Sequence, residues 1–282
     1  MIAITGARGY LGAALCDALS RSGHRVRRLT RAPDGARGDA FFSLGEGVSD
    51  GALAGVETLI HAAHDFRPRR EDELRRLNVE GSRGLFAAAR GAGVRRILFV
   101  SSIASWAEAR SAYGRAKWTL EQEVASRGGA SIRPGLVFGV DKGGTFATLD
   151  RAVRALPLLP DFGERTRLHA VHRDDLIDVV KAWLALDEQR APRLIPAAHP
   201  EPLTLRRVLA AIAAAAGRAP RFIRIPGLPA LAGIRLLESA GFALPFRSDG
   251  LTSILHANPA PGLVEEVLGV RLRPLEPWTI DE

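Results

Sequence analysis

Short apolar runs alternate with longer amphipathic runs along the first half of the chain, which is the pattern of a parallel β-sheet with helices on both of its faces. Apolar runs of strand length that end at glycine, proline or serine predict the strands. In chain order these expected strands begin at Ile2 and then cover residues 25–30, 56–63, 94–101 and 130–133, with a short strand near Phe41. Apolar residues at helical spacing predict helices after Gly12 and over residues 71–90 and 113–126.

Three glycines, Gly6, Gly9 and Gly12, join the first strand to the helix that follows it. Glycine lets a turn take backbone angles that are closed to other residues, and it lets a pyrophosphate reach the main chain without meeting a Cβ atom. The spacing differs from the commoner Gly-x-Gly-x-x-Gly fingerprint of dinucleotide-binding folds. Because a buried strand runs directly into the glycines, we expect a nucleotide site here. The alternative is a structural turn with tight packing at Gly12.

Prolines become frequent after Gly135 and divide the rest of the chain into shorter elements. We expect a strand over residues 168–171 that returns to the sheet, helices over 174–186, 205–216, 230–239 and 263–268, and a short strand over 221–225. The resulting fold class is α/β, a doubly wound parallel sheet of the Rossmann type with a smaller, mainly C-terminal α/β substrate lobe. Residues 1–135 plus about 166–189 form the expected dinucleotide-binding domain, and about 136–165 plus 190–282 the substrate-binding lobe.

Ser102, Tyr113 and Lys117 form the most specific chemical pattern in the sequence. Tyr113 and Lys117 are four residues apart and share one face of a helix, so the ammonium group can stand near the phenol oxygen. A nearby cation lowers the pKa of a tyrosine toward the working range of an acid/base group. Ser102 follows a strand and can hydrogen-bond the substrate oxygen. The alternative, a chance Tyr-x-x-x-Lys spacing, is rare in a chain with so few tyrosines and lysines.

With these motifs the sequence resembles the extended short-chain dehydrogenase/reductase family, in its NAD-dependent epimerase/dehydratase branch. The resemblance covers about the first half closely, from Thr5-Gly6-Ala7-Arg8-Gly9-Tyr10-Leu11-Gly12 through His61-Ala62-Ala63, Asn78-Val79-Glu80-Gly81, Val100-Ser101-Ser102 and Tyr113-Gly114-Arg115-Ala116-Lys117 to Arg133-Pro134-Gly135-Leu136-Val137-Phe138-Gly139.

The resemblance implies a role for each matching residue. Tyr113 would be the general acid/base, Lys117 would hold the nicotinamide ribose and lower the pKa of the tyrosine, and Ser102 would polarise the reacting carbonyl or hydroxyl. The implied cofactor-binding residues are Gly6, Arg8, Gly9, Tyr10, Leu11, Gly12, His61, Ala62, Ala63, Asn78, Lys117, Pro134, Gly135, Leu136 and Val137. The second lobe carries no sugar-nucleotide motif that we can name.

Thr30 and Arg31 add a cofactor preference, since the end of the second strand meets the adenosine ribose in this fold. No acidic residue that would grip a free 2′-hydroxyl stands between Thr30 and Asp34. Arg31 and Arg8 offer guanidinium groups for a 2′-phosphate, and the Thr30 hydroxyl adds a donor. We therefore expect NADP(H) rather than NAD(H), although arginine is so frequent in this chain that one match carries little weight.

Three classes of function remain open. The first is an NAD(P)-dependent enzyme that moves hydride between the nicotinamide and a hydroxyl or carbonyl of a small or sugar-like substrate, with a sugar-nucleotide epimerase or dehydratase holding NAD tightly as its variant. The second is a dinucleotide-sensing regulatory protein without turnover, against which the Ser102, Tyr113 and Lys117 set argues. The third is a nucleic-acid binder, which only the net charge of +8 supports.

Composition narrows these classes further. The arginines are spread along the chain without an aromatic platform, so no specific nucleic-acid partner is expected. The longest apolar run, 208–216, is too short to cross a bilayer, and Met1 leads straight into the first strand, so neither a membrane span nor a leader is expected. Cys16 is the one cysteine in the 282 residues, which favours a reducing cytoplasm.

Further polar and aromatic residues are candidates for metal binding, substrate contact or an interface. His61 and His64 have the spacing of a metal pair but no third ligand, so we expect no metal site. His64, Phe66 and Trp106 follow strands toward the cleft and either contact substrate or pack. A homodimer is expected through the helices that begin near Glu71 and Tyr113, where Leu120, Val124 and Phe86 offer apolar faces that are either core or interface.

Overall fold

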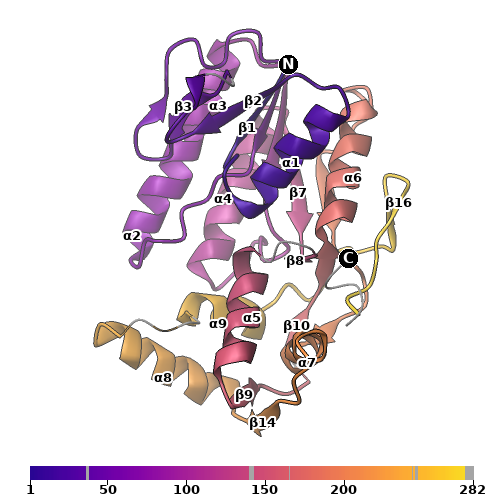
Figure 1. The fold of residues 1–282 in the computed structure, drawn as a ribbon. Coiled ribbons are helices and arrows are strands. Elements are labelled where there is room, and N and C mark those ends of the chain that lie inside the picture. The colour runs from indigo at the N-terminus through magenta and orange to yellow at the C-terminus, as the bar shows by residue number, and fades with distance from the viewer. Residues whose placement is uncertain (36–37, 140–142, 165, 243, 245–246, 277–282) are drawn as a thin grey trace.

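The computed structural model describes residues 1–276 apart from 36–37, 140–142, 165, 243 and 245–246. Within these residues one large sheet organises the molecule (Figure 1). Its strand order is β12(Leu194–Ala197), β7(Ala130–Pro134), β6(Arg96–Val100), β5(Thr58–His61), β1(Ile2–Thr5), β2(Val26–Thr30), β3(Ala40–Ser43) and β4(Gly47–Val48). Neighbouring strands run parallel except β3 and β4. The doubly wound fold class is confirmed.

Helices cover both faces of the sheet because its strands alternate their side chains between two cores. Ile2 and Ile4 of β1 face a core that includes α1(Tyr10–Arg21) and α6(Arg173–Ala185), whereas Ala3 faces the core of α3(Gly81–Gly91) and α4(Ala112–Ser126). The helix expected over residues 71–90 is continuous but includes a π-helical turn. It consists of α2(Glu71–Leu74), η2(Arg75–Glu80) and α3.

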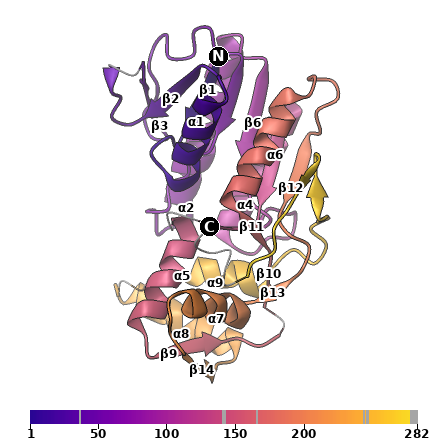
Figure 2. The ribbon, with the colours of Figure 1, turned by 45° about the vertical axis from the view of Figure 1, so that its right-hand side comes forward.

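Most of the remaining elements gather below the sheet and form what we call the second lobe (Figure 2). Its core joins α5(Gly144–Ala155) to α7(Leu205–Ala215). Short two-stranded sheets of the lobe pair β8(Leu136–Phe138) with β11(Ala170–His172), β9(Leu158–Asp161) with β14(Arg221–Arg224), and β10(Arg167–Leu168) with β13(Leu203–Thr204). The helices α8(Gly227–Ser239) and α9(Ser248–Leu255) complete the lobe. The hairpin of β15(Glu266–Val267) and β16(Val270–Arg271) lies outside it, beside α6 and β12, where Val267 joins the core of α1 and α6.

Three predictions about this half of the chain are wrong. The strand expected over 168–171 does not return to the large sheet, because β10 and β11 pair with β13 and β8 instead. The strand that does join the sheet is β12, which the expected division placed in the substrate lobe. Residues 263–268 form no helix. Leu268 takes a positive φ of 52° in the turn between β15 and β16, which a helix cannot contain.

A buried ion pair anchors α4, the helix that carries Tyr113 and Lys117, on the sheet. Arg133 of β7 donates from Nε and Nη2 to the two carboxylate oxygens of Glu121, at 2.8 and 2.5 Å. Three apolar residues are buried in the core between α3, α4 and the sheet: Phe86 of α3, and Leu120 and Val124 of α4. These apolar residues are therefore core, and they supply no interface for a second copy of the chain.

Candidate active site

The glycine loop after β1 is closed so tightly that side chains would not fit. Gly6 has a positive φ of 68°, and a Cβ atom on it would lie 2.9 Å from the amide nitrogen of Ala63. A Cβ atom at Gly12 would lie 2.1 Å from the carbonyl oxygen of Gly6, which is an impossible contact. Gly9 donates its N–H to that same oxygen at 2.8 Å. The loop therefore places the amino-terminal end of α1 at the carboxyl edge of the sheet, as a phosphate cradle requires.

The other residues of this motif lie around the loop. Arg8 is exposed, Leu11 packs on the core behind α1, and the ring of Tyr10 lies so close to Gly143 that a Cβ atom there would come within 2.3 Å of it. The guanidinium of Arg173 stands 5.5 Å from the centre of the Tyr10 ring. Tyr10 thus packs the loop against the start of α5 and α6.

His61 supports the site from inside the sheet. Its Nδ1 lies 2.7 Å from Thr5 Oγ1 and its Nε2 lies 2.8 Å from Ser82 Oγ. Ala62 and Ala63 donate their N–H groups to Thr5 Oγ1, both at 3.1 Å. Complete burial lowers the pKa of His61 to about 3, so the ring is neutral. With both nitrogens bonded, His61 offers none to a metal and positions the segment after β5 through Thr5.

Asn78 fixes the continuation of that segment. Its Oδ1 accepts the N–H of Asp65 at 2.7 Å, and its Nδ2 donates to the carbonyl oxygens of Asp65 and Leu74, at 3.0 and 3.2 Å. Asn78 sits in the π-helical turn η2, a feature that often marks functional sites. Gly81, one residue beyond η2, lets Leu44 approach, because a Cβ atom on it would lie 2.0 Å from the Leu44 carbonyl oxygen.

Ser102, Tyr113 and Lys117 come together at the carboxyl end of β6. Ser102 hydrogen-bonds the Tyr113 side chain. The side-chain nitrogen of Lys117 lies 5.7 Å from the centre of the Tyr113 ring and 4.6 Å from that of Phe99. Gly114 permits this packing, since a Cβ atom there would lie 2.5 Å from the carbonyl oxygen of Ala104. The three residues that the sequence predicts as catalytic thus share one site.

The expected electrostatic effect of Lys117 on Tyr113 is wrong. Burial raises the pKa of Tyr113 to about 12, and the hydrogen bond from Ser102 only partly offsets this. Burial also lowers the pKa of Lys117 to about 7, although Glu121 opposes the shift. At neutral pH the amine is therefore charged only part of the time, and Tyr113 is a phenol that can donate a proton.

Two aromatic side chains from the segment after β5 cover Tyr113. The rings of His64 and Tyr113 meet edge to face with centres 5.0 Å apart, and Phe66 stacks on Tyr113 at 5.8 Å. Phe66 is 65% exposed, so the outer side of this cover faces solvent. Among the described residues Trp106 makes no ring contact with Tyr113. His64 and Phe66 form an apolar wall beside the phenol.

The segment Pro134 to Val137 leads from the large sheet into the second lobe. Ile103 donates its N–H to the carbonyl oxygen of Pro134 at 3.0 Å, which ties the segment to the loop that carries Ser102. A Cβ atom at Gly135 would lie 2.2 Å from the carbonyl oxygen of His169, so glycine is required there. Leu136 and Val137 pair with Ala170 and Val171 of β11.

The end of β2 carries the residues expected at the adenosine ribose. Thr30 is 5% exposed, and its hydroxyl oxygen has no hydrogen-bond partner among the described residues. Arg31 is exposed beside it, close enough to Asp65 to lower the pKa of that carboxyl, after the larger effects of Arg67. A cradle that excludes Cβ atoms and a buried, unpaired hydroxyl together fit a nucleotide cofactor.

Two residues at this site have no local sequence signal. Asp249 accepts hydrogen bonds from the backbone of Ala112 and Tyr113, and Arg247 donates to the carbonyl oxygens of Phe66 and Pro68. Both belong to the start of α9, far along the chain, where no motif or periodicity connects them to Tyr113.

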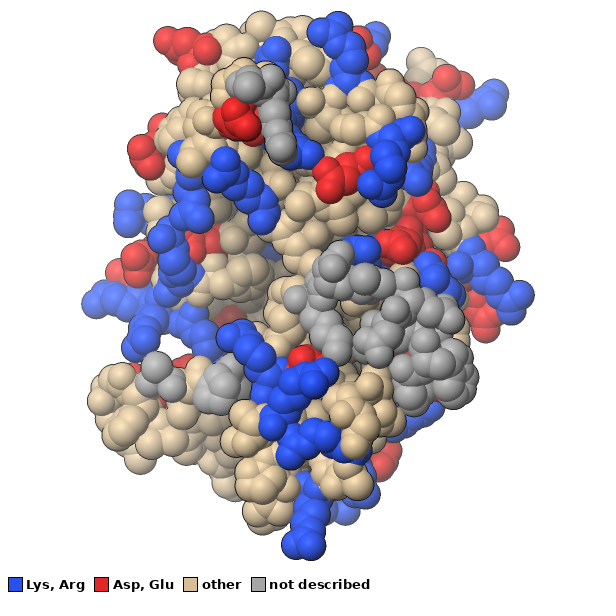
Figure 3. Space-filling view, in the orientation of Figure 1, with Lys and Arg blue, Asp and Glu red and all other residues tan. Residues whose placement is uncertain are grey.

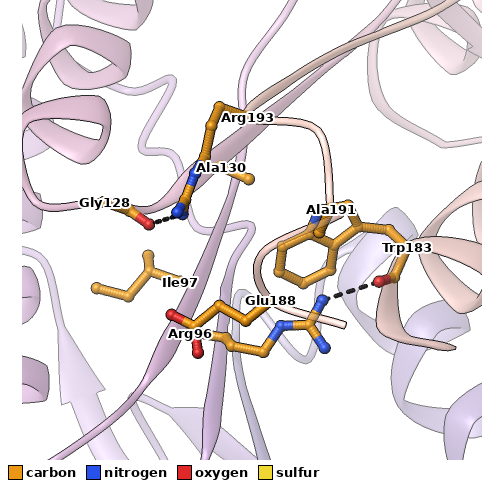
Figure 4. A pocket seen from close by; sticks show the side chains of 8 residues that line it. All are labelled: Arg96, Ile97, Gly128, Ala130, Trp183, Glu188, Ala191 and Arg193. Carbon is orange, nitrogen blue, oxygen red and sulfur yellow. Dashed lines mark hydrogen bonds between the residues drawn. The ribbon is translucent and has the colours of Figure 1, made fainter. Parts of the chain in front are cut away.

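Figure 3 shows the surface hollowed between the sheet above and the α8 and α9 region below, with acidic and basic side chains distributed over this face. A separate small pocket lies at the amino ends of β6 and β7, the opposite end of these strands from Ser102 (Figure 4). There the guanidinium of Arg96 stacks on Trp183 at 4.1 Å and donates to its carbonyl oxygen at 2.8 Å. We assign that pocket to packing.

None of the described helices combines the length and the apolar character that a membrane span needs.

Comparison with known proteins places this site in context. The model of the NAD dependent epimerase/dehydratase family matches residues 2–148. The ceramide reductase of Caulobacter vibrioides is 30% identical over 240 residues, which cover 80% of this chain and 74% of that protein.

Solved structures agree in fold. A short-chain dehydrogenase/reductase superfamily protein from Agrobacterium tumefaciens with bound NAD has a TM-score of 0.64 at 23% identity, covering 90% of this chain and 95% of that one. The UDP-glucose 4-epimerase of Thermotoga maritima, solved with UDP-glucose, has a TM-score of 0.67 at 17% identity, covering 96% and 93%.

Proposed function

The chain belongs to the NAD-dependent epimerase/dehydratase family, and from this premise we propose that it reduces the carbonyl group of an apolar substrate. As a member it is an NAD(P)-dependent oxidoreductase or epimerase of the extended short-chain dehydrogenase/reductase type. The proposal concerns the direction of the reaction, the substrate class and the cofactor.

The observation that carries the direction is the state of Tyr113. Its pKa of about 12 keeps the phenol protonated at neutral pH, which suits a group that donates a proton to a carbonyl oxygen. Ser102, hydrogen-bonded to the phenol, would hold the same oxygen from the other side. The reduced nicotinamide, when bound, supplies the hydride to the carbonyl carbon. Tyr113 supplies the proton to the oxygen, so an alcohol forms and the phenol is restored by a proton from solvent.

The apolar wall of His64 and Phe66 supports the substrate class. Burial lowers the pKa of His64 well below its usual range, so the ring carries no charge toward the substrate. A substrate beside these rings and Tyr113 would gain by burying apolar surface. The Caulobacter relative is by name a reductase of ceramide, a lipid, which favours the same class. The rings of His64 and Phe66 carry no charge that could pair with the phosphates of a sugar nucleotide.

We propose NADP(H) as the preferred cofactor. The buried unpaired hydroxyl of Thr30 and the guanidinium of Arg31 suit a ribose 2′-phosphate. Gly6, Gly9, Gly12 and the first amides of α1 would hold the pyrophosphate. Lys117 and the segment Pro134 to Val137 would hold the nicotinamide end of the cofactor.

The test is a reduction assay on purified protein, following the loss of NADPH or NADH absorbance with long-chain ketones, steroid ketones and UDP-glucose as probes. We expect turnover of an apolar ketone with NADPH, and a loss of about 10²-fold or more in kcat in Tyr113→Phe with cofactor affinity kept. Wild-type turnover in Tyr113→Phe would overturn the role of the phenol. Co-purified NAD with interconversion of UDP-sugars would instead establish the epimerase alternative.

Three further proposals complete this assignment. The sheet with β12 binds the cofactor and the second lobe binds the substrate, which limited proteolysis with and without NADPH would test.

The protein works in the cytoplasm, in keeping with the buried Cys16, because burial raises the pKa of its thiol to about 11. It forms a homodimer, as the family resemblance implies. Light scattering that gave a monomer mass would reject the dimer.

A further inference from the structure

The start of α9 contacts both walls of the candidate active site. The carboxylate of Asp249 accepts the N–H of Ala112 at 2.7 Å and that of Tyr113 at 3.1 Å. Two residues earlier, Arg247 donates from Nη1 to the carbonyl oxygens of Phe66 and Pro68, at 2.8 and 3.0 Å. One short segment of the second lobe therefore holds the backbone of the tyrosine and the backbone of its aromatic cover.

The contact with α4 satisfies amides that the helix itself cannot. The first four N–H groups of an α-helix lack intrahelical acceptors. Ser111 accepts the N–H of Gly114 at 3.1 Å, and the amides of Ala112 and Tyr113 go to Asp249. A carboxylate in this position makes charge-assisted hydrogen bonds and interacts favourably with the helix dipole. The position of Tyr113 thus depends on a residue outside its own domain.

The segment is itself fixed by α8. Glu238 accepts the N–H of Ser248 at 3.1 Å and also bonds its hydroxyl. Gly227 at the start of α8 lies so close to Leu255 that a Cβ atom would come within 2.5 Å of its Cδ2. Because α8 and α9 pack as a pair, a displacement of this pair would withdraw both contacts from the active site.

We propose that Asp249 is a positioning residue for Tyr113 and that Arg247 is a positioning residue for the wall of His64 and Phe66, so that the seated α9 completes the active site. This inference rests on the proposed role of Tyr113 as the proton donor. Asp249 acts on Tyr113 through hydrogen bonds to the helix backbone and through its negative charge. Arg247 acts on the aromatic wall beside the substrate through hydrogen bonds to the backbone of Phe66 and Pro68.

The charge of Asp249 gives the proposal a spectroscopic signature. Among the described residues, the titratable or hydrogen-bonding groups that act on the Tyr113 phenol or lie beside its ring are Ser102 from the loop after β6, Lys117 from α4, His64 from the segment after β5, and Asp249 from α9. Ser102 is uncharged and His64 is neutral, whereas Asp249 opposes the formation of phenolate. Removing its charge while keeping its shape should therefore make Tyr113 a stronger acid.

The first experiment follows tyrosinate absorbance against pH in a Tyr10→Phe background, where Tyr113 is the single tyrosine because the chain has 2. Asp249→Asn should lower the Tyr113 midpoint by about half a pH unit or more. Ser111→Ala, the matched control, removes a cap of the same helix without removing charge and should leave the midpoint in place. An unchanged midpoint in Asp249→Asn, or an equal shift in Ser111→Ala, would overturn the role of Asp249.

The second experiment distinguishes the effects of Asp249 and Arg247 on the kinetics of reduction. Its substrate is the ketone that gives the highest kcat/KM in the reduction assay described above. Asp249→Asn should lower kcat by about 10-fold with the substrate KM nearly unchanged, since a displaced catalytic group costs rate rather than binding. Arg247→Leu should raise the KM several-fold with less effect on kcat, and Arg235→Ala on the exposed side of α8 should change neither. Equal effects of both variants on kcat and KM would contradict this division.

The two experiments test the positioning role of Asp249 separately from the proposed reduction of a ketone. The absorbance titration needs no substrate, so it decides the role of Asp249 even if no ketone is reduced. Failure of the ketone panel would count against the proposed function alone, and NADPH affinity measured by fluorescence in each variant would show that the sheet domain is intact.

Discussion

The side-chain nitrogen of Lys117 lies 5.7 Å from the centre of the Tyr113 ring, yet it donates its hydrogen bond to the carbonyl oxygen of Val100, at 2.8 Å. Val100 ends β6, immediately before the loop of Ser102. The buried amine is therefore held by the sheet rather than by the phenol. Its low pKa of about 7 makes the stability of the protein sensitive to pH near neutrality.

The first prediction concerns that sensitivity in the absence of cofactor. Burial lowers the pKa of Lys117 from 10.5 to about 7. Between these values the unfolded chain binds a proton that the folded protein does not, so the free energy of unfolding should rise as the pH increases from about 7 to about 10. Lys117→Met removes this titration and should flatten the rise, as measured by urea unfolding at several pH values. Identical slopes in the two proteins would contradict the low pKa.

The second prediction tests the glycine cradle. A Cβ atom at position 12 would lie 2.1 Å from the carbonyl oxygen of Gly6, so Gly12→Ala should distort the loop and lower cofactor affinity by about tenfold or more. Gly84→Ala is the matched control, because Gly84 is an exposed residue of α3 with nothing within 4 Å of an added Cβ. Calorimetric titration with NADPH measures both. Unchanged affinity in Gly12→Ala would exclude this loop as the phosphate site.

The third prediction concerns cofactor choice. Arg31→Ala should weaken NADPH binding by about tenfold and leave NADH binding nearly unchanged, because only NADPH has the 2′-phosphate that a guanidinium can pair with. Arg76→Ala on the exposed side of η2 carries the same change of net charge and controls for general attraction. Tighter binding of NADH than of NADPH to the wild-type protein, unaffected by Arg31→Ala, would refute the role of Arg31 and favour the epimerase alternative.

The fourth prediction addresses the anchor of α4. The side chains of Arg133 and Glu121 are only 10% and 4% exposed, so removing one partner leaves a buried charge unpaired. Glu121→Gln should lower the free energy of unfolding by about 3 kcal/mol, and the double variant Glu121→Leu with Arg133→Met should recover most of that loss. Denaturant unfolding of the three proteins measures it. A double variant less stable than the single one would show that the pair contributes more than mutual neutralisation.

Much of the fold could be predicted from local pattern. The strands of the first half and the helix that carries Tyr113 appear where apolar spacing placed them, with ends that differ by a few residues. The second half was less predictable because most of its strands pair outside the large sheet, so their partners depend on contacts that no local pattern shows. Residues 263–268 show the failure plainly, since an apolar run that suits a helix is divided by the turn at Leu268.

The candidate site also has parts that local motifs predicted and parts that they did not. The glycine loop and the juxtaposition of Ser102 with Tyr113 follow from motifs on consecutive elements. His61 was predicted beside the cofactor, and the structure instead buries its ring between Thr5 and Ser82. The helix α9 was not predicted, because a short segment containing Gly250 has a weak helical pattern and depends on contacts with α4 and α8.

By itself, then, the sequence determined the strand, glycine turn and helix that open the chain and the helix face that Tyr113 shares with Lys117, because spacing along one element is local geometry. The tertiary structure alone decided the direction in which the pKa of Tyr113 moves and the residue that holds its backbone. Both depend on burial and on contacts between segments far apart in the chain. Desolvation outweighs the neighbouring amine, and Asp249 reaches α4 only because α9 folds against it.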